Sequence, residues 1–243
     1  MPEEPKKKKK GVRLTARDLK IISWINSHRA ATAEQVHKKF DLSLLSAKKR
    51  LYELKSFDYL IYEKIFHDKP GIYRAGAKGI AVTNDSLPTI KIRLGSYEHD
   101  TKLIDLAISL EEKTGAHWQT DRQIRHEKGL KGVGNKGHSP DGVLEFKNGN
   151  KVAVELELSL KGSKRIEKIL KGYSRKEYKE VWYFVGSKSL SPKIIEAGIP
   201  FIKVFSFTDM TEIKAEEKPT EKTSGNVQTI DQQKAVKDFF QRK

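Results

Sequence analysis

The sequence predicts a mixed α/β chain of two units: a helical unit that ends in a β-hairpin, followed by an α/β unit built on a mixed sheet. Apolar residues recur at helical spacing early in the chain, and short alternating runs replace them after about residue 60. A longer succession of one helix and several alternating runs begins near residue 97. The expected divisions are a disordered basic tail at 1–11, the first unit at 12–85, a linker at 86–96, the α/β unit at 97–210 and a polar segment ending in a short helix at 211–243.

The charge balance points to a polyanionic partner. Lysine and arginine number 48 against 32 acidic residues, which gives a formal net charge of +16. Such a surplus attracts polyanions, of which nucleic acid is the commonest; a merely soluble basic protein is the alternative. The absence of cysteine excludes disulfides and thiolate metal sites, and it fits a cytoplasmic protein. No apolar run approaches the roughly 20 residues that cross a bilayer, so no membrane insertion is expected.

Three helices and a hairpin are expected in the first unit. Each helix begins at a residue that can cap its free amides, namely Thr15, Thr32 and Ser43. Two β-like runs follow at 60–66 and 72–74, on either side of a Lys-Pro-Gly turn. Three short helices before a hairpin are the layout of a winged helix-turn-helix, whose third helix enters the major groove of double-stranded DNA.

The third helix and the hairpin supply candidate DNA contacts. Lysine and arginine can reach guanine edges or phosphates, and serine can reach either. The candidates on the helix are Ser43, Ser46, Lys48, Lys49 and Arg50, and those on the hairpin are Lys64, Lys69 and Arg74. A winged helix that contacts protein instead of DNA is the alternative.

Helices and strands alternate in the expected α/β unit. Residues 97–113 carry an apolar stripe at helical spacing, and Gly115 follows as a helix stop. A basic, glycine-rich loop is expected at 127–139. The remaining elements are strands at 117–122, 142–146, 151–160, 181–185 and 201–207, and helices at 164–176 and after Pro192. A helix between two of these strands acts as a right-handed crossover, so the strands at 151–160 and 181–185 should pair in parallel.

The runs before and after residues 147–149 fix the register of a hairpin. Apolar side chains occupy the even positions of both runs, and a slip of one residue would turn them to the other face. A two-residue loop breaks this match. A three-residue loop with Gly149 in the left-handed conformation preserves it and pairs Leu144 with Val152.

The same register predicts a group of carboxylates on the solvent-facing side of the hairpin. Asp141 stands opposite Glu155, where Cβ atoms are about 4.5–5.5 Å apart, and Glu157 lies about 7 Å further along. Carboxylates this close repel each other unless a cation compensates, and Mg²⁺ or Mn²⁺ is the usual one. Such an ion can activate water for attack at phosphorus. A solvated acidic strand face is the alternative.

The order of these motifs resembles the PD-(D/E)XK nuclease superfamily and, more narrowly, the replication-relaxation family of plasmids and other mobile elements. The motifs are Glu98-His99, Trp118, Asp121-Arg122-Gln123-Ile124-Arg125, His138-Ser139-Pro140-Asp141-Gly142 and Glu155-Leu156-Glu157-Leu158-Ser159-Leu160-Lys161. The resemblance covers about residues 12–207. It implies an α-β-β-β-α-β nuclease-like core and DNA binding in plasmid replication or mobilisation. The family is similar to the MobC-type relaxases, which are thought to nick DNA at a transfer origin.

The resemblance also implies roles for single residues. Asp141, Glu155 and Glu157 would be catalytic carboxylates and metal ligands. Glu98, Asp100 or Asp105 would supply a further ligand, of which the resemblance favours Glu98. The superfamily has a lysine two residues after Glu155, and this chain has Glu157 there, which puts cleavage in doubt. Lys164 or Lys168 on the next helix is the candidate substitute; the alternatives are a site that binds metal without cutting and an inert site.

Several alternatives stay open at this level. Asp121, Arg122 and Arg125 contribute a structural ion pair, or Arg125 contacts a phosphate. His99 either assists proton transfer or makes a structural hydrogen bond. A homodimer and contacts of 211–243 with replication or mobilisation proteins are further expectations. The function expected is a DNA-binding replication or mobilisation protein, either a metal-dependent origin nickase or a non-catalytic origin-binding or transcription-regulatory protein.

Overall fold

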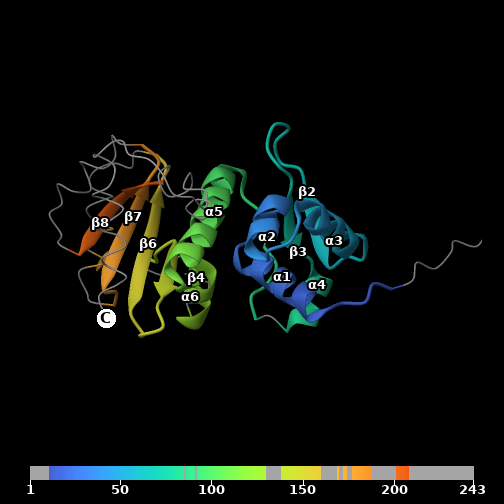
Figure 1. Cartoon of the computed structure of the whole chain (residues 1–243), viewed down its shortest axis with the longest axis horizontal. Coiled ribbons are helices and arrows are strands. Elements are labelled where there is room, and N and C mark those ends of the chain that lie inside the picture. The colour runs from blue at the N-terminus through green and yellow to red at the C-terminus, as the bar shows by residue number, and fades with distance from the viewer. Residues whose placement is uncertain are drawn as a thin grey trace, which may run out of the picture.

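The computed structural model describes residues 11–84, 86–90, 92–129, 138–159, 169, 172–173, 177–187 and 201–207. Among these residues the strands form a three-stranded antiparallel sheet and a five-stranded mixed sheet (Figure 1). The predicted mixed α/β class is thereby confirmed. Within the described part of the chain, no helix is both long enough and apolar enough to cross a membrane.

The N-terminal unit packs helices against the small sheet, whose strand order is β1-β3-β2. Its elements are α1 (Ala16–Ser27), β1 (Ala31–Thr32), α2 (Ala33–Lys39), α3 (Leu44–Ser56), β2 (Leu60–Glu63), β3 (Ile72–Ala75) and α4 (Ala77–Thr83). The predicted caps are confirmed, because Thr15, Thr32 and Ser43 each accept the backbone amide three residues further on. One apolar core then joins α1, α2 and α3 to the sheet.

The N-terminal unit departs from the sequence prediction at its C-terminal side. The predicted strand 60–66 ends at Glu63, where its pairing with Ile72 closes the ladder. Helix α4 was not predicted; it ends at Asn84, which adopts a left-handed conformation with φ 53°. Gly79 lets α4 approach β2, because a Cβ there would lie 2.2 Å from the Tyr59 carbonyl oxygen.

The α/β unit is a mixed sheet of order β4-β5-β6-β7-β8. A short 3-10 helix, η1 (Leu94–Ser96), precedes α5 (Tyr97–Thr114), β4 (His117–Thr120), α6 (Asp121–Glu127), β5 (Gly142–Glu145), β6 (Lys151–Glu157), β7 (Glu180–Val185) and β8 (Ile202–Ser206). Strands β4, β5 and β6 pair antiparallel, whereas β6, β7 and β8 pair in parallel. The parallel pair predicted for β6 and β7 is confirmed. The expected helices at 164–176 and after Pro192 lie largely outside the described residues, as do Lys164, 1–10 and 211–243.

Helix α5 covers one face of this sheet. Its buried stripe of Leu103, Leu106 and Leu110 packs on the even-numbered residues of β6, and Gly115 ends the helix in a left-handed conformation as predicted. A second cluster lies on the other face. It includes Ala153 of β6, Tyr173 from between β6 and β7, and residues of β7. Strand β6, the central strand with β5 antiparallel on one side and β7 parallel on the other, is therefore buried on both faces of the sheet.

The segment after β4 was predicted incorrectly. A strand was expected at 117–122, but β4 ends at Thr120 and α6 begins there. The Thr120 side chain accepts the Gln123 amide, while the Gln123 side chain accepts the Thr120 amide, so the two residues form a capping box. This Thr-x-x-Gln pattern is visible in the sequence and is the signal that the prediction overlooked.

The two units meet along α5, which stands between the five-stranded sheet and the helices of the N-terminal unit (Figure 1). Polar contacts from α5 and α6 join them. These are Arg29 with Asp121, Lys39 with Glu111, Gln35 with Asp105 and the Thr101 carbonyl, Arg122 with the Asn26 and Pro88 carbonyls, and Tyr97 with the Pro70 carbonyl. The number and spread of these contacts fix the orientation of one unit against the other.

Candidate functional site

The hairpin register predicted from the alternating residues is confirmed. Leu144 pairs with Val152, and Gly142 pairs with Val154. The Phe146 amide donates to the Asn150 carbonyl at 2.9 Å, which closes a three-residue loop. Gly149 has φ 80°, the left-handed conformation that this loop requires. Asp141, one residue before Gly142, therefore arrives beside the C-terminal half of β6.

Asp141 is held in place by backbone and ring contacts. Its Oδ2 accepts the Leu156 amide at 2.9 Å. The next residue must be glycine, because a Cβ on Gly142 would lie 1.9 Å from an atom of the Trp118 ring. Trp118, itself 3 % exposed, thus rests directly on the backbone that carries Asp141.

Glu155 is buried and hydrogen-bonded instead of facing solvent. It is 4 % exposed, and its Oε1 accepts from the Tyr173 hydroxyl and from His138 Nε2, the latter at 2.5 Å. Burial, together with the charge of Asp141, raises the pKa of Glu155 to about 7 despite these hydrogen bonds. Tyr173 was absent from the sequence prediction, since it lies 18 residues beyond Glu155 and belongs to no recognised motif.

His99 approaches Asp141 from the first turn of α5. Its Nε2 lies 3.2 Å from the Leu156 carbonyl oxygen and 3.4 Å from Asp141 Oδ2, and its Nδ1 lies 3.6 Å from Asp100 Oδ1. Burial lowers the pKa of His99, but the bonds with Asp100 and Asp141 outweigh it and raise the pKa to about 10. An imidazolium therefore stands against Asp141 at neutral pH.

The prediction that these carboxylates lie on a solvent-facing side of the hairpin is wrong. Glu155 and Glu157 are each 4 % exposed, because the second core cluster covers their face of β6. Glu98, the further ligand implied by the resemblance, is instead an exposed residue, and its carboxylate pairs with Lys102 at 2.8 Å. His99, not Glu98, is the residue of this turn that reaches Asp141.

The described residues do not form a ligand set for a divalent cation. No group of three or more histidine, aspartate or glutamate side chains among them converges in the geometry that a metal ion needs. Glu155 is engaged by Tyr173 and His138, and Asp141 by His99 and the Leu156 amide. The Mg²⁺ or Mn²⁺ site stays a prediction.

Two buried hydroxyls near these carboxylates lack a partner among the described residues. They are Ser139 Oγ and the Tyr183 hydroxyl. Tyr183 is the neighbour of Glu155 in the β6–β7 register, and Ser139 lies two residues before Asp141. Unpartnered buried hydroxyls are rare because their desolvation is not repaid, so this end of β6 has unused hydrogen-bonding capacity.

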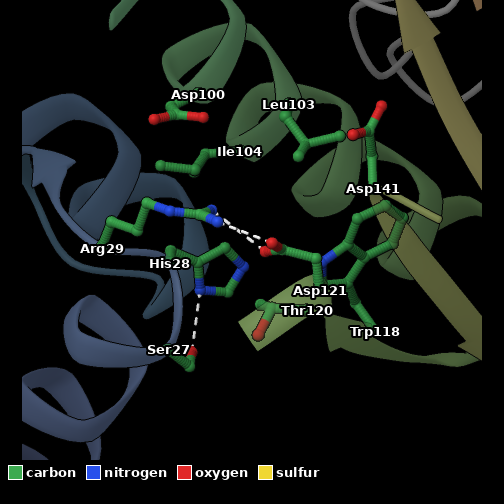
Figure 2. Close-up of a pocket in the computed structure, with 10 residues that line it drawn as sticks. All are labelled: Ser27, His28, Arg29, Asp100, Leu103, Ile104, Trp118, Thr120, Asp121 and Asp141. Atoms are coloured by element: carbon green, nitrogen blue, oxygen red, sulfur yellow. Dashed lines mark hydrogen bonds and ion pairs between the residues drawn. The ribbon is translucent and has the colours of Figure 1, made fainter. Parts of the chain in front are cut away.

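A small pocket lies between the two units beside Asp141. Figure 2 shows Arg29 reaching from the N-terminal unit to Asp121, with which it makes hydrogen bonds of 3.0 and 2.6 Å. The pocket is lined by Ser27, His28, Arg29, Asp100, Leu103, Ile104, Trp118, Thr120, Asp121 and Asp141. Arg29 has φ 71°, a left-handed value that residues with a side chain rarely adopt. The structural ion pair expected of Asp121 is therefore made with Arg29.

His28 contributes a buried imidazole to the same pocket. Its Nδ1 donates to the Trp24 carbonyl at 2.9 Å, while its Nε2 has no partner among the described residues. Burial lowers the pKa of His28 to about 4, so the ring is neutral at physiological pH. No sequence signal distinguished this histidine from a surface residue.

The predicted DNA-contact residues of α3 fall into two groups. Ser43, Ser46, Lys48 and Lys49 are exposed, and Ser43 also caps the helix. Arg50 faces inward, and its Nε and Nη2 donate to the carboxylate of Asp18 at 2.7 and 2.5 Å. A guanidinium committed to a fully buried carboxylate is not displayed to a ligand, so the assignment of Arg50 to DNA contact is corrected to an internal ion pair.

The hairpin candidates are similarly divided. Lys69 is exposed, and Lys64 is exposed with its Nζ donating to the Lys69 carbonyl at 2.5 Å. Arg74 pairs with Glu63 across the hairpin. Arg125 lies in the last turn of α6, on the α/β unit and away from α3.

Comparison with known proteins adds no relative. No protein-family model matches the chain, and neither a curated protein nor a solved structure matches it significantly.

Proposed function

We propose that this chain binds double-stranded DNA, with the N-terminal unit acting as a winged helix and α3 as its recognition helix. The observation that carries the proposal is the outward face of α3. One side of this helix packs into the core through Ala47, Leu51 and Leu54. The other side, called here the α3 face, consists of the exposed residues Leu45, Lys48, Lys49, Tyr52 and Lys55.

The composition of the α3 face suits a DNA groove. Its lysines can neutralise phosphates, which supplies most of the affinity of such complexes. Leu45 and Tyr52 are 78 % and 66 % exposed, so two large apolar groups lie among the lysines. Apolar side chains at these positions can contact thymine methyl groups.

The connection between β2 and β3 supports the same surface. Residues 64–71, called here the hairpin loop, extend from the unit beside α3 and carry the exposed Lys64 and Lys69. In a winged helix this loop contacts the backbone next to the groove that the recognition helix occupies. The formal net charge of +16 favours the same partner.

A wider role in plasmid or mobile-element replication or mobilisation follows from the resemblance of the motif order. Under this proposal the α/β unit supplies a surface next to bound DNA. Non-catalytic origin binding is the function that the hydrogen-bonded, buried state of Glu155 supports best. A transcription regulator built on the same two units is the variant of this proposal that differs only in the DNA target.

The salt dependence of DNA affinity tests the proposal. A 40-base-pair duplex is first selected from a random library by binding to the full chain. The Lys48→Ala, Lys49→Ala double variant should then bind more weakly, with the slope of log K against log salt reduced by about 2, because each phosphate contact contributes about one unit. Electrophoretic mobility shift at several salt concentrations gives the slope.

The matched control removes two lysines from the opposite end of the molecule. Lys147 lies in the β5–β6 loop and Lys179 just before β7, and both are exposed. The Lys147→Ala, Lys179→Ala variant should keep the wild-type slope. Equal losses in the two double variants would show that binding follows total charge and would overturn the α3 assignment.

Metal-dependent nicking is the second candidate function. The hydroxyls of Ser139 and Tyr183, which have no hydrogen-bond partner among the described residues, favour it, because they leave hydrogen-bonding capacity beside Asp141 and Glu155. A supercoiled plasmid that carries the selected duplex, incubated with Mn²⁺, tests it. Nicking that disappears in both Asp141→Ala and Glu155→Ala supports this candidate. Intact binding without nicking rejects it and retains the non-catalytic proposal.

A further inference from the structure

The first turn of α5 connects the hairpin loop to the carboxylates of β6. The Tyr97 hydroxyl donates to the Pro70 carbonyl at 2.8 Å, and the Tyr97 ring meets Phe66 edge-on with centroids 5.2 Å apart. Two residues later, His99 Nε2 lies 3.2 Å from the Leu156 carbonyl oxygen. Because a helix rises about 1.5 Å per residue, both contacts fall within about 3 Å along the axis of α5.

The boundary between the units keeps this arrangement rigid. Arg29 meets both carboxylate oxygens of Asp121, and Lys39 meets Glu111 at 2.5 Å near the other end of α5. Tyr97 is also part of a buried apolar cluster with residues of the N-terminal unit. A two-pronged arginine contact fixes orientation as well as distance, so it holds the N-terminal unit in one orientation against α6.

Exposed positive charge continues from the hairpin loop toward the same turn. Lys64 and Lys69 lie in the loop, and Arg93 is exposed directly before η1. The carboxylate of Glu98, which is exposed in this turn, is paired with Lys102. Lys69 lies 3.7 Å from the exposed carboxylate of Asp68 in the same loop. A phosphate backbone that leaves the hairpin loop in this direction would still pass Lys64, Lys69 and Arg93 on its way to Asp141.

We propose that the duplex held by α3 and the hairpin loop runs on past the first turn of α5, so that Asp141 and its neighbours face the DNA on one fixed side of the recognised sequence. This inference rests on the proposed DNA binding. The hairpin loop and β6 are separated by the diameter of α5, which is roughly 10–12 Å with its side chains included. This is less than the ~34 Å of one turn of duplex. The contact therefore falls within about one helical turn of the sequence that α3 contacts.

The absence of cysteine gives a direct test. A cysteine introduced by Glu98→Cys, at a position 74 % exposed, carries an iron–EDTA group that cuts neighbouring DNA by diffusing hydroxyl radicals. With the duplex selected by binding, the cuts should form one cluster on a single side of the protected sequence, within about 10 base pairs of its edge. The matched control places the same group at Asn148→Cys, on the exposed β5–β6 loop, and should give no cluster.

The outcomes separate this inference from DNA binding itself. Protection of the duplex with no cluster from Glu98→Cys, or with equal clusters on both sides, overturns the inference and leaves DNA binding standing. Failure to select or protect any duplex overturns both. A further variant, Arg29→Ala added to Glu98→Cys, should broaden the cluster without abolishing protection, because it releases the contact that fixes the two units.

Discussion

Helix α3 and strand β6 both carry charged side chains at regular spacing, but the fold treats them in opposite ways. On α3, the side chains of Lys48 and Lys49 are exposed to solvent, while Arg50, the next residue in the chain, forms an ion pair with the buried Asp18. On β6, Glu155 and Glu157 are buried, because the second core cluster covers their face of the sheet. Charged residues next to one another in sequence are therefore either displayed or internally paired, and only the packing around them decides which.

The largest effect expected from this contrast is on stability, at Arg50. The Arg50→Ala substitution leaves the carboxylate of Asp18, which is fully buried, without its cation, and it should lower the free energy of unfolding by about 3 kcal/mol. The Thr15 amide and hydroxyl still bond to Asp18, which keeps the loss near the lower end for buried pairs. Urea denaturation followed by circular dichroism measures it.

Lys49→Ala is the matched control on the same helix. Lys49 is exposed, so its removal should change the free energy of unfolding by less than about 0.5 kcal/mol while weakening DNA binding. Equal destabilisation by Lys49→Ala and Arg50→Ala would show that the internal ion pair of Arg50 contributes no more to stability than the exposed Lys49 does.

The next effect is a pH dependence at Glu155. Since the folded-state pKa of about 7 lies above the ordinary value of 4.5, the folded protein binds more protons than the unfolded chain between these values. Stability from this group is thus present at low pH and is lost as pH rises through 7. The Glu155→Gln variant does not titrate there, so between pH 5 and 8 it should gain about 2 kcal/mol relative to wild type.

Comparing the two proteins removes the contribution of His28. Its pKa is lowered to about 4, which gives the opposite sign, with stability lost as pH falls from about 6.5 toward 4. Both proteins contain His28, so the difference between their urea midpoints at each pH reports Glu155. A difference that stays constant from pH 5 to 8 would mean that Glu155 has an ordinary pKa.

The smallest effect is at the link between the two regions. Tyr97→Phe removes the hydroxyl that donates to the Pro70 carbonyl and leaves the ring contact with Phe66, so stability should fall by about 1 kcal/mol. Faster hydrogen exchange confined to the hairpin loop and the start of α5 should accompany it. Faster exchange spread over the whole molecule would show that this bond supports the core instead of the link.

The sequence predicted what depends on local spacing. Caps at Thr15 and Thr32, the stop at Gly115 and the register around Gly149 are set by residues within a few positions of one another, and the structure has them as expected. Helix α6 was missed although its Thr120 cap follows the same local rule.

What the sequence did not predict depends on distant partners. Arg50 pairs with Asp18, which lies 32 residues earlier, and Glu155 accepts a hydrogen bond from Tyr173, which lies 18 residues later, between β6 and β7. Periodicity identifies which residues share a face of a strand or helix. It does not identify what packs on that face, and for β6 the covering residues change an expected solvated surface into an interior one.

The close fit of Trp118 on Gly142 has an optical consequence. An indole buried to 3 % exposure and resting on the backbone beside Asp141 should change its fluorescence emission when anything binds or moves that carboxylate. Trp24 lies in the N-terminal unit and Trp182 on β7, so replacing both by phenylalanine leaves a single emitter at the junction. The fluorescence of Trp118 would thus report whether binding at α3 changes the surroundings of Asp141 between β5 and β6.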